Sequence, residues 1–262
     1  RGGHSGLEID KGRGNAIKIL NRALLRLSPL GSRLSVLEGG NKRNAIPREC
    51  SAVLFVPKKK LKEAQKLIGG LNAMFRAELG SVEPDLLVSL SEMKGAKRGT
   101  VIKKALQEKM CRTIAALPHG VLKMSADIPG LVETSTNVAV ISTTKKGVVL
   151  ATSQRSSVAS ELDEAVETVT SVLELGGAGI ESSDGYPGWK PDLDSAILKI
   201  AKSTYQSLFG RESQIKAIHA GLECGIIGER FPGMDMVSFG PTMEGVHSPD
   251  EKLYIDTVDK FY

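Results

Sequence analysis

The spacing of apolar residues predicts four amphipathic helices in the first 175 residues of the chain. In each of them, apolar side chains recur every three or four positions, which places them on one face of a helix. The predicted helices span residues 11–27, 59–79, 100–117 and 158–175.

Short apolar runs between these helices predict β-strands, and residues 145–147 predict a hairpin turn between the last two runs. Helices that alternate with antiparallel strands are typical of a sheet with helices on one face, so we expect an α+β arrangement in this part. The predicted strands span residues 33–38, 50–56, 85–91, 120–126, 136–143 and 147–153.

The pattern changes around residues 182–191, a segment with two prolines, two glycines and the only tryptophan of the chain. We therefore expect two domains, at 1–186 and 187–262. The second resembles the end of an α/β sheet, with a helix capped by Asp192 or Asp194. Its further predicted elements are a strand at 214–218, a helix at 225–231, a strand at 236–239 and a helix from about 251.

The second domain is too short to fold as a complete α/β domain, because two strands and three helices bury too little apolar surface. The chain also begins without methionine, in the glycine-rich sequence RGGHSG. We therefore expect a fragment whose missing strands precede Arg1.

Composition excludes several classes of partner. Aromatic residues make up only 4% of the chain, which argues against a stacking platform for single-stranded nucleic acid. No apolar run reaches the roughly 18–20 residues that a membrane span needs. The three cysteines are widely spaced and form no C-x-x-C pair, which favours a reducing cytoplasm. We expect a cytoplasmic protein that binds neither nucleic acid nor membranes.

Histidines are the main candidates for chemistry, and there are four. His4, His219 and His247 stand in glycine-rich loops next to predicted strands, where binding residues are common; a surface or capping role is the alternative for each. His119 is predicted to be structural. The chain has no H-E-x-x-H, no H-x-D and no adjacent glutamate pair, so it cannot supply a two-metal hydrolytic centre by itself. It also lacks a G-x-S-x-G motif.

Two polar residues at strand ends are further candidates. Arg155 closes a predicted strand and precedes a helix, which is an unfavourable place for a cation. It is either an exposed arginine or a clamp for a carboxylate. Asn137 is either a turn residue or an amide donor to a substrate carbonyl.

Five motifs occur in the order found in aminoacyl-histidine dipeptidases, and the chain resembles this family over its whole length. The family is also called Xaa-His or cytosol non-specific dipeptidases, a carnosine-cleaving branch of the di-zinc peptidases. The motifs are RGGHSG at 1–6, PGLVETSTN at 129–137, QRSS at 154–157, AIHAGLECG at 217–225 and FGPTMEGVHSP at 239–249.

The resemblance implies that residues 1–186 are a lid, or dimerisation, domain and that 187–262 are the C-terminal segment of a zinc-peptidase catalytic domain. It implies a homodimer that hydrolyses Xaa-His and other dipeptides with two zinc ions. By the same resemblance, His247 is a metal ligand and His4 polarises the scissile carbonyl.

The resemblance also makes Asn137 and Arg155 substrate contacts, with Arg155 on the free carboxylate. Glu223 and His219 belong to a loop that lines the substrate pocket. The family's other metal ligands and its general base have no counterpart in this sequence, so we expect the chain to be inactive alone. Two alternatives remain: a non-catalytic lid-like module for dimerisation or binding, and a pseudo-enzyme whose ligands come from another chain.

Overall fold

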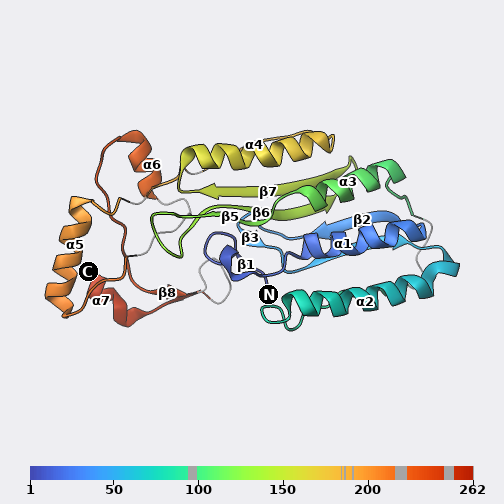
Figure 1. Cartoon of the computed structure of the whole chain (residues 1–262), viewed down its shortest axis with the longest axis horizontal. Helices are drawn as coiled ribbons and strands as arrows, with labels where there is room; N and C mark the ends of the chain where they lie inside the picture. The colour runs from blue at the N-terminus through green and yellow to red at the C-terminus, as the bar shows by residue number, and fades with distance from the viewer. Residues whose placement is uncertain are drawn as a thin grey trace.

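A computed structural model describes residues 1–93, 99–183, 185, 187–190, 192–215, 223–244 and 251–261. The main sheet and helices α1–α4 lie at one end of the molecule, and the short elements that follow residue 187 gather at the other end (Figure 1). The helices and strands before residue 187 are β1 Gly3–His4, α1 Ala16–Leu27, β2 Arg33–Gly39, β3 Ala45–Ile46, β4 Cys50–Phe55, α2 Leu61–Leu79, α3 Lys104–Ala116, β5 Gly120–Met124, β6 Val132–Thr143, β7 Val148–Ser156 and α4 Ala159–Leu175.

One antiparallel sheet organises this first part, and β6 is its central strand. β7 pairs along one edge of β6. On the other edge β5 pairs near the start of β6 and β2 pairs near its end. β4 continues the sheet beyond β2. The backbone N–H of Thr144 donates to the carbonyl of Gly147 at 2.7 Å, which closes the β6–β7 hairpin. The predicted antiparallel sheet and hairpin are confirmed.

Helices α1, α3 and α4 pack on one face of the sheet around the larger hydrophobic core, as the sequence predicts. A second core lies where α2 packs against α1, so α1 contributes buried side chains to both cores. The larger core contains Ile17, Leu24, Leu34, Leu37, Cys111, Ile114, Leu117, Val138, Ile141 and Val169. The second contains Ile19, Ala23, Leu27, Ala64, Ile68, Leu71, Phe75 and Val88.

The start of α1 is fixed by the buried side chain of Asn15. Its Oδ1 accepts the backbone N–H of Ile17 at 3.0 Å and of Lys18 at 3.2 Å, as an N-cap does. Its Nδ2 donates to the carbonyl of Val138 on β6 at 2.8 Å. The helix predicted from residue 11 therefore begins at Ala16.

His119 has the structural role that the sequence predicts. Its Nδ1 lies 3.4 Å from the backbone nitrogen of Val138, which donates to it, and 3.3 Å from the Asn15 side-chain nitrogen. Burial, with a smaller contribution from Lys18, lowers the pKa of His119 to about 4. The ring is therefore neutral at physiological pH.

The strand predicted at 85–91 is wrong. This segment is extended, but no strand pairs with it; the side chain of Asn72 on α2 takes the place of a partner strand. Asn72 donates its Nδ2 to the carbonyl of Val88 at 2.7 Å and accepts the N–H of Val88 at 2.8 Å. The apolar alternation that suggested a strand serves instead to pack this segment on α2 in the second core.

The second part is a set of short elements, and none of its described residues belongs to a hydrophobic core cluster. No residue of α5 is buried, and Leu208 on this helix is 70% exposed. The elements are α5 Ala196–Phe209, α6 Glu223–Arg230, β8 Met243–Glu244, β9 Lys252–Leu253 and α7 Val258–Phe261.

Several predictions for this part are wrong. Residues 236–239 form no strand, because no described segment pairs with them. The closing segment from Glu251 is a short strand, β9, followed by a 3-10 turn and the one-turn helix α7. Ser195 caps α5 in place of Asp192 or Asp194. Residues 214 and 215 of the strand predicted at 214–218 are not in a strand, and its other residues lie outside the described part.

Within the described residues, no helix is both long and apolar enough to span a membrane.

The neutral, half-buried His119 predicts that the stability of the fold falls in acid. In the unfolded chain this imidazole binds a proton near its ordinary pKa of 6.5, whereas in the folded chain it does so only near pH 4. Its contribution is therefore complete above pH 6.5 and is lost as the pH falls towards 4, by roughly 1.4 kcal/mol per pH unit, or on the order of 3 kcal/mol in all.

Urea unfolding of the wild type and His119→Gln at several pH values between 4 and 7 measures this. The variant, which cannot be protonated, should show a flatter dependence of unfolding free energy on pH. Equal slopes would contradict the assignment.

Candidate functional site

His4 lies in a tight turn at the start of the chain. Both the N–H of Gly6 and the N–H of Leu7 donate to its Nδ1, each at 3.1 Å. The carbonyl of His4 accepts the N–H of Glu8 at 2.9 Å, and the Glu8 carboxylate accepts the N–H of His4 at 2.8 Å. The turn therefore fixes both the backbone and the ring of His4.

An ion pair supports this turn from outside. Arg13 lies 2.6 Å from the Glu8 carboxylate, and its guanidinium also donates to the carbonyl of Gly2. Gly3 has φ +153°, a backbone conformation that other residues rarely adopt, and a Cβ there would also displace the ends of the Arg13 and Glu8 side chains.

Asn137 is buried on β6, with only 1% of its surface exposed. Its Nδ2 donates to the carbonyl of Ala45 at 2.8 Å. Ala45 pairs with His4 in the small β1–β3 ribbon. The amide of Asn137 thus holds the segment that lies beside His4, and its Oδ1 is buried without a hydrogen-bond partner.

Arg155 lies on β7, and its guanidinium is partly removed from solvent. Burial lowers the pKa of this guanidinium, although an arginine remains charged. Its Nε is buried without a hydrogen-bond partner, and no described carboxylate lies within salt-bridge distance of the side chain. A desolvated cation without a counter-charge is costly, which makes this side chain a strong candidate for binding an anionic group.

Sheet register places Arg155 and Asn137 on the same face. Arg155 lies opposite Ser135, which is two residues from Asn137 on β6. Directly opposed residues, and residues two apart, project to one side of a sheet. Val138, the neighbour of Asn137, points the other way into the helix-covered core. The candidate site is therefore on the sheet face that the helices leave free.

Two glycines bring the start of α6 towards the end of β7. A Cβ on Gly188 would lie 2.7 Å from the carbonyl oxygen of Ser156, and one on Gly225 would lie 2.5 Å from that of Pro187. The backbones therefore pack too closely for any larger residue. Glu223 is exposed in the first turn of α6, where an acidic residue complements the helix dipole.

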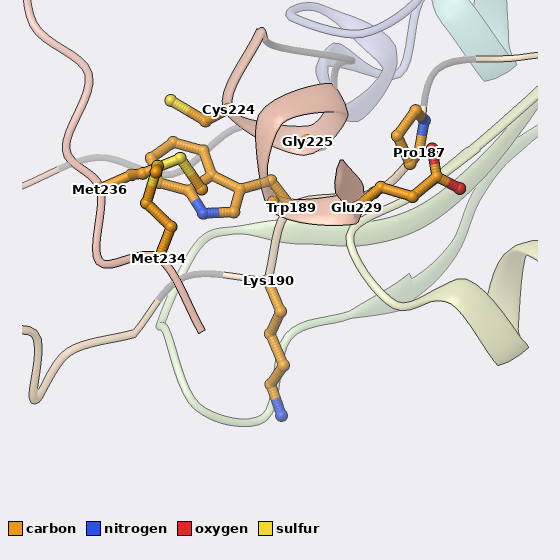
Figure 2. A pocket seen from close by; sticks show the side chains of 10 residues that line it. Pro187, Trp189, Lys190, Cys224, Gly225, Glu229, Met234 and Met236 are labelled. Carbon is orange, nitrogen blue, oxygen red and sulfur yellow. The ribbon is translucent and has the colours of Figure 1, made fainter. Parts of the chain in front are cut away.

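A hollow of about 330 Å³ opens beside α6. Figure 2 shows the Trp189 indole beside the thioethers of Met234 and Met236, while the side chain of Lys190 points away from them. Among the described residues that line it, Glu229 is the one carboxylate. The lining mixes apolar side chains with polar groups, and it does not include the polar residues predicted to act on a substrate.

The described residues contain no group of three or more histidine, cysteine or carboxylate side chains that could hold a metal ion. Two predicted site residues, His219 and His247, lie outside the described part. Burial raises the pKa of the Cys50 thiol to about 12 and that of Cys111 to about 11, so neither is a thiolate at neutral pH.

Sequence reasoning missed the residues that support His4. Glu8 and Arg13 have no motif of their own, and their contacts appear only once the turn closes. Asn15 had a recognisable signal, since it directly precedes the apolar spacing of a helix, as an N-cap residue does.

Comparison with known proteins shows which family the chain resembles. Residues 1–83 match the family model of the peptidase dimerisation domain. The whole chain aligns with the cytosol non-specific dipeptidase of Escherichia coli K12, at 39% identity over 263 positions that cover 54% of that protein. Its fold matches the crystal structure of aminoacylhistidine dipeptidase from Vibrio alginolyticus with a TM-score of 0.88 and 42% identity, covering all of this chain and 53% of that one.

The chain thus spans about half the length of both relatives. The family resemblance read from the five sequence motifs is confirmed: residues 1–83 match the peptidase dimerisation domain, and the whole chain is similar to about half of a cytosol non-specific, or aminoacylhistidine, dipeptidase.

Proposed function

We propose that this chain is the lid and the C-terminal catalytic segment of a metal-dependent dipeptidase that hydrolyses Xaa-His and other dipeptides. Residues 1–186 form the lid, and residues 187–262 form the catalytic segment. The observation that carries the proposal is the desolvated guanidinium of Arg155, which has no described carboxylate partner. A dipeptide presents a free carboxylate, the group that an arginine binds with two parallel hydrogen bonds.

His4 and Asn137 have different roles in this proposal. His4 donates a hydrogen bond to the carbonyl oxygen of the scissile bond and to the oxyanion that forms from it. Removal of one such donor typically lowers the rate on the order of 100- to 1000-fold. Asn137 is buried and bonded to Ala45, so it positions the segment beside His4 and does not touch the dipeptide.

The remaining assignments rest on the family resemblance. Glu223 and His219 line the substrate pocket, and His247 binds a metal ion in the full-length enzyme. Glu223 is exposed at the start of α6, where a ligand can reach it. His219 and His247 lie outside the described residues.

Zinc is the metal that the resemblance implies, but the described residues do not make a zinc site. The nucleophile and its activation therefore belong to groups outside them. What the described residues supply is recognition and electrostatic stabilisation: Arg155 holds the carboxylate end of the dipeptide, and His4 polarises its carbonyl.

We also propose a homodimer, as the match to a dimerisation domain suggests. Among the described strands, β4, β5 and β7 each leave one edge of the main sheet unpaired, and an unpaired edge is able to pair with a second chain. A cytoplasmic location is supported by the name of the Escherichia coli relative.

A non-catalytic lid-like module for dimerisation or binding is the second candidate. It is favoured by the dimerisation-domain match and by the lack of a metal-binding cluster in the described residues. The two candidates differ in whether the chain supports catalysis once the rest of a dipeptidase is supplied.

The chain alone should not hydrolyse Xaa-His dipeptides, and it should bind less than one equivalent of zinc, weakly. A single retained ligand cannot hold the ion against water, since zinc sites use three or four protein ligands. Isothermal titration with zinc and an assay of histidine release from β-alanyl-histidine measure both properties. Stoichiometric, tight zinc binding with turnover would show that the chain is complete as an enzyme.

A chimera tests whether the chain can serve as part of an active dipeptidase. This chain would replace the matching 54% of the Escherichia coli dipeptidase. The folded chimera should hydrolyse Xaa-His dipeptides, and Arg155→Ala should raise its KM about 10- to 100-fold, the loss expected for a charge-assisted hydrogen bond.

The matched control is Arg48→Ala, because this arginine is exposed and, among the described residues, its ion pair is with its neighbour Glu49 at 3.6 Å. The control should leave KM unchanged. A folded but inactive chimera would favour the lid-like module, and an unchanged KM in Arg155→Ala would contradict the carboxylate assignment.

A further inference from the structure

The His4 turn selects one tautomer of the imidazole. The N–H groups of Gly6 and Leu7 both point at Nδ1 from 3.1 Å. A backbone N–H is only a donor, so Nδ1 must present its lone pair to them. In the neutral ring the proton is then on Nε2. If Nδ1 carried the proton, its N–H would face the N–H groups of Gly6 and Leu7, and none of the three donors would have an acceptor.

We propose that residues 2–8 form a preset turn that holds His4 as the Nε2–H tautomer, and that Glu8 and Arg13 are the positioning residues of this turn. The catalytic meaning of this inference rests on the proposed dipeptidase function, whereas the tautomer itself is a property of the isolated chain. Glu8 holds the N–H of His4 through its carboxylate, and Arg13 holds that carboxylate and the carbonyl of Gly2.

The tautomer decides what His4 can do. A neutral ring with its proton on Nε2 donates a hydrogen bond from that nitrogen, and its Nδ1 is already occupied by two backbone donors. Such a ring offers no nitrogen lone pair to a metal ion or to a proton on the substrate. It can donate to a carbonyl oxygen or an oxyanion. The turn therefore assigns His4 to electrostatic stabilisation and excludes the roles of metal ligand and general base.

The surrounding residues leave little room for another arrangement. Gly2 has φ +66°, and a Cβ there would lie 2.7 Å from the carbonyl oxygen of Ile46. The N–H of Ser5 donates to the carbonyl of Asn44 at 2.9 Å, which anchors the far side of the turn. The ring orientation is thus built into the backbone before any substrate binds, as preorganised stabilisation requires.

Long-range ¹H–¹⁵N correlation spectra of the ¹⁵N-labelled chain at neutral pH report which ring nitrogen carries the proton. His4→Gln assigns the His4 signals among the four histidines. The wild type should show a single Nε2–H tautomer for His4. Added zinc should leave the His4 signals in place, because neither ring nitrogen offers a lone pair.

Two variants test the positioning residues. Glu8→Ala removes the acceptor of the His4 N–H, and should speed hydrogen exchange of that amide roughly 10-fold or more and let both tautomers appear. Glu8→Gln keeps an acceptor oxygen but loses the ion pair with Arg13, so it should keep the tautomer with a smaller change in exchange. Asp10→Asn is the matched control, since the ion pair of Asp10 within the described part of the chain is with Lys11, at 3.0 Å, in the same short segment.

The inference is overturned by an Nδ1–H tautomer or a tautomer mixture in the wild type, by zinc-induced shifts of the His4 signals, or by Glu8→Ala behaving like Asp10→Asn. None of these results depends on turnover. If the tautomer is as expected and the chimera is folded but inactive, the proposed function fails while the structural inference stands.

Discussion

The buried side chain of Asn15 is the constraint on which the arrangement of the first part depends. It caps α1 through Ile17 and Lys18, and it bonds the carbonyl of Val138 in the middle of the central strand. One amide therefore sets where the helix begins and where it lies against the sheet. A lost N-cap costs about 0.5–2 kcal/mol, and the unpaired carbonyl of Val138 adds to that loss.

The same constraint reaches the candidate site, because only the short segment 9–15 separates the His4 turn from α1. Asn15 fixes the helix on β6, and Asn137 on the same strand fixes the segment that pairs with His4. Both amides donate to backbone carbonyls. β6 thus positions His4 from two sides and places Arg155 on the neighbouring strand. The parts of the site are brought together by one strand, although they are about 150 residues apart in sequence.

Local pattern was enough to predict the first part of the fold. Apolar spacing found the four helices and most strands of the sheet, because the helices each bury one apolar face and the strands carry short apolar runs, although β6 is buried on both faces. It failed at residues 85–91, where Asn72 supplies the hydrogen bonds that a strand would have supplied. It failed again at 236–239, since an apolar run forms a strand only if a neighbouring strand is present to pair with it.

The sequence motifs predicted which residues belong to the candidate site, but they did not predict the contacts that each residue makes. Motifs pointed to His4, Asn137 and Arg155, and the structure places all three around β6 and β7. Their contacts in the structure distinguish their roles. The side-chain amide of Asn137 donates a hydrogen bond within the fold, whereas the guanidinium of Arg155 has no described carboxylate partner. The tautomer of His4 follows from two backbone N–H groups, which no side-chain motif reveals.

The central claim is that the two larger hydrophobic cores lie within residues 1–175, whereas the described elements after residue 187 leave many apolar side chains exposed and contribute to neither core. Hydrogen–deuterium exchange of the isolated chain, read by mass spectrometry, tests it directly. The account predicts strong protection in α1 and β6 and little protection in α5 and α6, because exposed helices without tertiary packing open at low cost. Equal protection of α5 and β6 would contradict it.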